Sequence, residues 1–261
     1  MLHIENLTVS VGNGGSRKAI LKDLNLHISE GEVHVLFGPN GSGKSTLVSA
    51  ILGLPGYNVE RGTIKFKGQD ITGMSIDERV NMGIGVVFQY PPAIRGIKLN
   101  DIANLALKRK SHEVATETRS LASRLNVDQF LQRDVNLGFS GGEKKRSEVM
   151  QIMLQDPDFL LLDEPDSGVD VENVQLLGNE LSEFLQREEI PNKRRKAGLI
   201  ITHLGFMLNY IDTDRAHVMC EGNLLCSGKP KEILDAILEN GFDKCVKTCL
   251  VNTQEQEVEQ S

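Results

Sequence analysis

The chain has 261 residues, of which 39% are hydrophobic and 25% are charged, and its formal net charge is -7. This length allows one large α/β domain, and the acidic balance argues against a nucleic-acid partner. No run approaches the ~20 apolar residues that a membrane-spanning helix needs, and Met1 to Glu5 lack the pattern of a signal peptide. We therefore expect a cytoplasmic protein that does not insert directly into a membrane.

Short apolar or alternating runs predict strands, and longer amphipathic runs predict helices. In chain order, strands are expected over residues 2–11, 19–28, 33–37, 62–66, 84–88, 159–162, 199–201 and 217–219. Helices are expected over residues 45–52, within 92–135, and over 141–155, 171–185 and 229–240. In addition, Ser75 to Glu78 fit a capping box that opens a short helix, and Glu221 to Asn223 form a tight turn.

The alternation of strands and helices predicts an α/β fold with a largely parallel sheet. The first strands look antiparallel, which predicts an N-terminal antiparallel β subdomain and a mixed sheet at that end. A helical subdomain is expected over about residues 92–157, inside a single domain of residues 1–250. Residues 251–261 are rich in Gln and Glu, which is typical of a disordered tail.

A glycine-rich loop follows the third expected strand and matches the pattern G-x-x-x-x-G-K-[ST] in full. Its residues are Gly38, Pro39, Asn40, Gly41, Ser42, Gly43, Lys44 and Ser45, and these and the following Thr46 are predicted to bind ATP. Glycines let the backbone N–H groups point at phosphates, and the helix that begins here adds the positive end of its dipole. In this P-loop pattern, Lys44 reaches the outer phosphates and the Ser45 hydroxyl binds Mg²⁺. A glycine-rich turn that fits the pattern by chance is the alternative.

Two acids follow the apolar run Phe159 to Leu162. Because strand ends beside a phosphate loop are where ligands bind in open α/β sheets, Asp163 suits a Mg²⁺ ligand. Glu164 is then placed to deprotonate the attacking water. A strand cap without chemistry is the alternative.

Further motifs, in matching order and spacing, resemble the ATP-binding-cassette family over nearly the whole chain. They are the signature Ser140, Gly141, Gly142 and Glu143 after Phe139, the Q-loop Gln89, the D-loop Ser167 to Asp170, and the switch residue His203. The resemblance implies a P-loop ATPase core that takes ATP and Mg²⁺, with Gln89 contacting both and with Lys44, Glu164 and His203 as catalytic residues. It also implies an ATP-dependent homodimer, in which the signature acts in trans on the other subunit's ATP and Asp170 lies at the dimer contact.

Three segments resemble the SufC-type branch of that family, whose members are the ATPases of iron–sulfur cluster assembly. These segments are Phe88 to Pro91, Gly138 to Arg146 and Asp163 to Gly168. Within the last segment, Pro165 resembles the residue of the transporter ATPases, which points to an archaeal-type branch. This resemblance implies a SufB- or SufD-like scaffold partner, which we expect to dock on Tyr90, Pro91, Pro92 and the helical insert. Two alternatives remain: the ATPase subunit of a membrane transporter, and a nucleotide-dependent binding module without useful hydrolysis.

Two side-chain groups lead to further expectations. The cysteines match no zinc or iron–sulfur pattern, so we expect reduced thiols, although Cys245 and Cys249 can share a helix face and form a weak metal site. Lys144 or Lys145 is expected to pair with Glu164 or Asp166. An opposite charge within a few ångströms redirects a carboxylate, so such a pair would keep hydrolysis slow until a partner closes the dimer.

Overall fold

The computed structural model describes residues 1–12, 17–203 and 205–242, which form two β-sheets with helices around them. The smaller sheet has the order β2 (Lys18–Ile28), β1 (Leu2–Val11), β4 (Tyr57–Phe66) and β5 (Gln69–Asp70). All of its neighbouring strands are antiparallel, as the sequence predicted for this end of the chain. One face is apolar because side chains alternate along a strand, and Leu2, Ile4, Leu7 and Val9 are fully or almost fully buried there.

The larger sheet carries the loops with the predicted site residues. Its order is β10 (Asn223–Gly228), β9 (Arg215–Cys220), β3 (Val33–Phe37), β8 (Ala197–Ile201), β7 (Phe159–Asp163) and β6 (Ile84–Val87). Five of these strands are parallel, and β3, β7 and β8 are buried along their whole length. Continuous apolar runs are typical of parallel strands covered on both faces.

The mixed character of the larger sheet lies at β10, which pairs antiparallel with β9. The expectation that the first strands would make the mixed edge is therefore wrong, because β1, β2 and β4 pair among themselves in the smaller sheet. The turn at Glu221 and Gly222 was predicted, but β10 after it was not. Its partial exposure at the sheet edge leaves it without the apolar run that marked the central strands.

The helices follow the predicted pattern. Their bounds are α1 (Lys44–Leu52), α2 (Ile76–Asn81), α3 (Leu99–Ala106), α4 (Thr116–Arg124), α5 (Gly141–Gln155) and α6 (Val171–Phe184), with short 3₁₀ turns at Asp128–Phe130, Pro191–Lys193 and Phe206–Asn209. Residues 230–242 are also helical. The capping box at Ser75 is present, because its side chain accepts from the N–H of Glu78 while the Glu78 carboxylate accepts from the N–H of Ser75.

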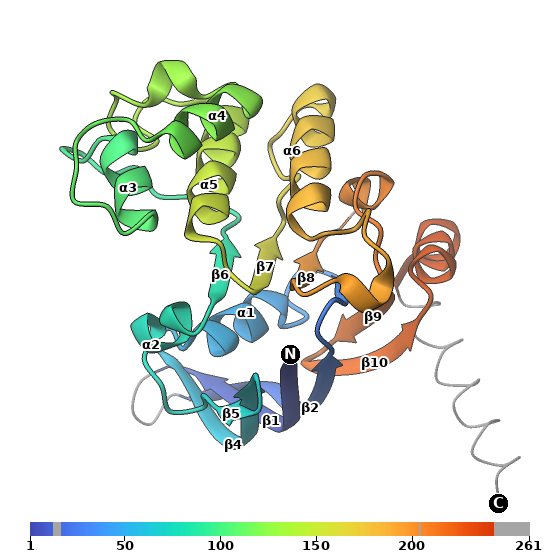
Figure 1. Cartoon of the computed structure of the whole chain (residues 1–261). Helices are drawn as coiled ribbons and strands as arrows, with labels where there is room; N and C mark the ends of the chain where they lie inside the picture. Colours follow the sequence, from blue (N-terminus) through green and yellow to red (C-terminus); the bar gives the residue numbers. More distant parts are fainter. Residues whose placement is uncertain (13–16, 204, 243–261) are drawn as a thin grey trace, which may run out of the picture.

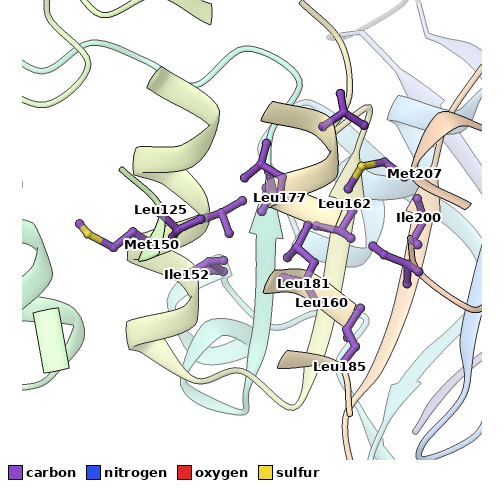
Figure 2. Close-up of a cluster of buried hydrophobic side chains, with 14 of the residues drawn as sticks. Leu125, Met150, Ile152, Leu160, Leu162, Leu177, Leu181, Leu185, Ile200 and Met207 are labelled. Atoms are coloured by element: carbon purple, nitrogen blue, oxygen red, sulfur yellow. The ribbon is translucent and has the colours of Figure 1, made fainter. Parts of the chain in front are cut away.

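Two apolar cores hold the layers together. One core packs α1 between the sheets, joining Leu47 and Ile51 to residues of both (Figure 1). The other lies between the larger sheet and helices α5 and α6. Figure 2 shows Leu160 and Leu162 of β7 facing Leu177 and Leu181 of α6. Burying apolar surface contributes ~25 cal/mol of free energy per Å². These two cores therefore stabilise the strand ends that carry the site.

Several expectations have a limited or different outcome. Cys226 of β10 is disulfide-bonded, so the expectation of reduced thiols is wrong for this residue. Cys245, Cys249 and the expected tail of residues 251–261 lie outside the described residues.

Residues 92–157 contain α3, α4 and α5, which lie at the end opposite the smaller sheet in Figure 1. The domain boundaries stay a prediction. Within the described part of the chain, no helix is long and apolar enough to cross a membrane.

Candidate functional site

Four loops with predicted site residues leave the same edge of the larger sheet. The phosphate loop follows β3, Gln89 follows β6, Asp163 ends β7, and His203 follows β8. Since these four strands are parallel, their carboxyl ends meet at one edge. Ligands bind at this edge in open α/β sheets, so the topology gathers residues that are up to 165 positions apart in the chain (203 − 38).

The phosphate loop is shaped by glycines at positions where a side chain does not fit. A Cβ at Gly38 would lie 2.4 Å from the carbonyl oxygen of Met219, and Gly43 has a φ of 113°. Gly43 is also the N-cap of α1 and supplies no side chain to cap it. The first N–H groups of α1 therefore remain available to an anion such as a phosphate.

The side chains of Lys44 and Ser42 are also placed to bind phosphate groups. Lys44 is 6% exposed, and its ammonium donates to the carbonyl oxygens of Gly38 at 2.7 Å and Pro39 at 3.0 Å. Burial lowers the pKa of Lys44, and the carboxylates of Glu164 and Asp163 oppose that shift. The buried hydroxyl of Ser42 has no hydrogen-bond partner within the described residues. A buried cation and an unsatisfied hydroxyl beside free helix N–H groups suit the oxygens of a polyphosphate.

Asp163 lies at the buried end of β7 and is 8% exposed. Burial, followed by the neighbouring charge of Glu164, raises the pKa of Asp163, while Lys145, Lys44 and His203 oppose the shift. A divalent cation would offset the free-energy cost of keeping this carboxylate charged while it is buried. The predicted Mg²⁺ ligands Asp163, Ser45 and Gln89 present carboxylate, hydroxyl and amide oxygens, which are the hard donors that Mg²⁺ prefers. The residues present therefore fit this ion.

Glu164 joins two of the other predicted site residues. Its Oε1 lies 2.8 Å from Nε2 of His203, and its Oε2 accepts a hydrogen bond of 2.5 Å from Nε2 of Gln89. The Glu164 backbone has a φ of 47°, an uncommon conformation for a residue with a side chain. Such outliers occur where the surroundings hold a functional group in place. Glu164 and His203 also line a cavity of about 460 Å³ that reaches Gly168.

The signature residues begin α5 and bond to one another. The Ser140 side chain accepts from the N–H of Glu143, and the Glu143 carboxylate accepts from the N–H of Ser140 at 2.7 Å. This backbone hydrogen bond from Ser140 lowers the pKa of Glu143. A Cβ at Gly141 would lie 2.6 Å from the carbonyl oxygen of Gly168, so the signature packs against the D-loop of its own chain.

Asp170 of the D-loop caps α6. Its carboxylate accepts from the backbone N–H of Asn173 at 3.0 Å and from the Asn173 side chain at 2.6 Å. These hydrogen bonds from Asn173 lower the pKa of Asp170. Arg146 of the signature helix donates to the Asn173 side chain. The D-loop and the signature helix are thus connected through Asn173, which the sequence analysis did not single out.

The expected pairing of Lys144 or Lys145 with Glu164 or Asp166 is wrong. Lys145 instead donates to the carbonyl oxygen of Phe88, and its ammonium lies 4.0 Å from Glu148. The position on α5 decides this outcome, because residues three apart on a helix are neighbours. Asp166 accepts a hydrogen bond of 3.3 Å from the Thr202 hydroxyl. Burial raises the pKa of Asp166, and Lys145 opposes this shift through space.

The surface after Gln89 borders a groove of about 620 Å³. Pro91 and Pro92 line it together with Ile102 and Leu105 of α3, and Glu148 of α5 lines it as well. Leu105 is 70% exposed. The expected docking residues Pro91 and Pro92 are thus brought beside the helical insert, and the neighbouring Tyr90 is 79% exposed.

Comparisons with known proteins agree with this arrangement. The profile of the family described as ABC transporter matches residues 21–167. The chain is 38% identical over 254 residues to the probable ATP-dependent transporter slr0075 of Synechocystis sp., covering 93% of this chain and 94% of that protein. It is 36% identical to the probable ATP-dependent transporter SufC of Escherichia coli, covering 87% of this chain and 92% of that protein.

One similar solved structure is a dimeric ATP-binding cassette in a post-hydrolysis state, bound to ADP and Pi. It matches with a TM-score of 0.73 at 21% identity and covers 88% of this chain and 98% of that chain. At this identity the likeness concerns the fold alone.

Proposed function

The chain belongs to the ABC transporter family of ATPases, and from this premise we propose that it drives conformational change in an iron–sulfur cluster assembly scaffold. It binds and hydrolyses ATP. The observation that carries the proposal is the path from the groove to the site: Phe88 lines the groove, and the next residue, Gln89, bonds to Glu164. A partner in the groove would therefore act close to the reacting groups.

In this proposal the phosphate loop binds the nucleotide and Glu164 prepares the water. Gly38 to Thr46 wrap the phosphates, with Lys44 leaving its loop carbonyls to reach the outer phosphate oxygens. Asp163, Ser45 and Gln89 would hold Mg²⁺, which would neutralise phosphate charge when bound. Glu164 accepts the proton of the attacking water, and Gln89 and His203 orient its carboxylate.

We propose an ATP-dependent homodimer in which each site needs both copies. Ser140, Gly141, Gly142 and Glu143 open α5, and a helix N-terminus attracts an anion. In trans, this end of α5 would contact the γ-phosphate bound to the other copy. Asp170, which caps α6, would lie at the contact between the copies. The solved structure described above is itself dimeric, which supports an assembly of two copies.

The proposed partner is a SufB- or SufD-like scaffold that docks in the groove. The relative named SufC supports this choice, as do the exposed Leu105 and Tyr90 beside the groove. We propose that the chain works in the cytoplasm as one domain over residues 1–250, with a helical subdomain over about 92–157. No nucleic acid takes part, in keeping with the net charge of -7.

A transport ATPase is the second candidate. Both relatives described above carry the words ATP-dependent transporter in their names, and in that case the groove would take a segment of a separate membrane subunit. The two candidates share the ATPase site and differ only in the partner.

Purified components distinguish the two candidates. We expect a SufB–SufD-like scaffold to co-elute with the chain in size-exclusion chromatography and to raise its ATP turnover. Leu105→Glu places a charge in the groove and is expected to abolish both effects. Ile190→Glu is the matched control, since Ile190 is also exposed, at 55%, and lies outside the groove. Equal turnover with and without the scaffold would contradict the scaffold proposal.

A further inference from the structure

Two charged side chains of α5, the buried Lys145 and the largely buried Glu148, lie beside the catalytic site. Their side chains are 2% and 12% exposed, and the ammonium and the carboxylate lie 4.0 Å apart. Burial lowers the pKa of Lys145 and raises the pKa of Glu148 to about 7. Burying two charges is costly, and a buried pair is weak as a source of stability. The contacts of the pair therefore indicate what it does.

Both side chains hold one residue of the Q-loop. The Glu148 carboxylate accepts a hydrogen bond of 2.8 Å from the backbone N–H of Phe88. The Lys145 ammonium donates to the backbone carbonyl oxygen of Phe88. Phe88 comes directly after β6, where the ladder to β7 has ended at Val87. Its backbone groups are thus satisfied by α5 instead of by the sheet.

The residue held in this way is the neighbour of Gln89. The Gln89 amide bonds to Glu164, so a continuous chain of contacts leads from Glu148 and Lys145 through Phe88 and Gln89 to Glu164. The N-cap of the same helix is Ser140, five residues before Lys145 (145 − 140). The pair therefore attaches the Q-loop to the helix that carries the signature.

We propose that Lys145 and Glu148 are positioning residues for ATP hydrolysis, which hold Phe88 so that the Gln89 amide stays on the Glu164 carboxylate. The inference rests on the proposed roles of Gln89 and Glu164. Neither Lys145 nor Glu148 touches the nucleotide in this account, and both act through the peptide groups of Phe88. A misplacement of about 1 Å in a catalytic constellation can lower a rate by up to ~100-fold.

Lys145→Met tests the proposal, because Met keeps much of the length of the side chain and removes the donor. We expect kcat for ATP to fall about tenfold, while the Kd for ATP stays within about twofold, since the phosphate loop is unchanged. The control is Arg187→Met. The Arg187 side chain is 1% exposed and, like Lys145, it contacts a backbone carbonyl and a carboxylate. These belong to Gly31 and Asp214, which lie at the edge of the sheet opposite the catalytic site. It should lower Tm and leave kcat unchanged for folded protein.

Glu148 gives a second test if Lys145→Met does not fold. Glu148→Gln retains an oxygen that accepts from the Phe88 N–H and should keep most of kcat, whereas Glu148→Leu loses the acceptor and should lower kcat as Lys145→Met does. The inference fails if Glu148→Leu and Glu148→Gln have the same kcat, or if Arg187→Met lowers kcat as much as Lys145→Met. Glu164→Gln is measured alongside. Unchanged turnover in Glu164→Gln would contradict the proposed catalytic role of Glu164. Lost turnover in Glu164→Gln together with normal turnover in Lys145→Met would contradict only the positioning role of Lys145.

Discussion

Gly222 supports the phosphate loop from behind, so Gly222→Ala should damage both stability and ATP binding. Gly222 has a φ of 84°, and a Cβ there would lie 1.8 Å from the carbonyl oxygen of Ile20. Its N–H donates to the carbonyl oxygen of Ser42 at 2.8 Å, and its own carbonyl accepts from Lys22 at 3.0 Å. Backbone atoms of β2 must therefore move to make room, and the bond to the phosphate loop moves with them.

The magnitude follows from two separate terms. A left-handed backbone costs an alanine about 1 kcal/mol, and forcing a methyl group into packed backbone adds about 2 kcal/mol. Gly68→Ala isolates the first term, because Gly68 has a φ of 80° and nothing within 4 Å of its added Cβ. With about 2–4 °C of Tm per kcal/mol for a chain of this size, the two variants should lose about 9 °C and about 3 °C respectively.

Thermal unfolding and fluorescent-nucleotide titration measure both effects. The Kd for ATP should rise in Gly222→Ala and stay unchanged in Gly68→Ala. If Gly222→Ala loses no more Tm than Gly68→Ala, then the close approach of Gly222 to Ile20 does not support the phosphate loop and the reasoning is wrong.

Three further predictions concern the carboxylates. Glu164→Gln keeps acceptor and donor atoms for Gln89 and His203 but removes the base. Phosphate release should therefore fall at least ~100-fold while ATP binding persists. Retained turnover would show that another residue is the base. Asp163→Asn should raise the Mg²⁺ concentration needed for half-maximal turnover, and a titration that matches the parent would exclude Asp163 as a ligand. For Glu148, with a folded pKa of about 7 against 4.5 when unfolded, the neutral form is favoured on folding. Its stabilising contribution is thus full below pH 4.5 and is lost as pH rises to about 7. Glu148→Gln should therefore gain stability relative to the parent over that window in urea unfolding, and a constant difference would contradict the raised pKa.

Local sequence determined the phosphate loop, the helix starts and the central strands. The left-handed backbone of Gly41 and Gly43 and the capping box at Ser75 depend on backbone geometry within a few residues, which the residue types themselves dictate. The continuous apolar runs of β3, β7 and β8 likewise identify buried strands without further context. These signals were enough to predict an α/β ATPase and the edge of the sheet at which it works.

Tertiary structure alone decided the partners of the charged side chains. Lys144 or Lys145 was expected to pair with Glu164 or Asp166 by opposite charge, yet Lys145 contacts Phe88 and Glu148, since the placement of α5 against β6 sets which atoms meet. The pairing of Gly222 with Ile20 and Ser42 also joins segments about 180–200 residues apart in the chain. Contacts between distant segments depend on how whole elements pack, and no periodicity within either segment encodes them.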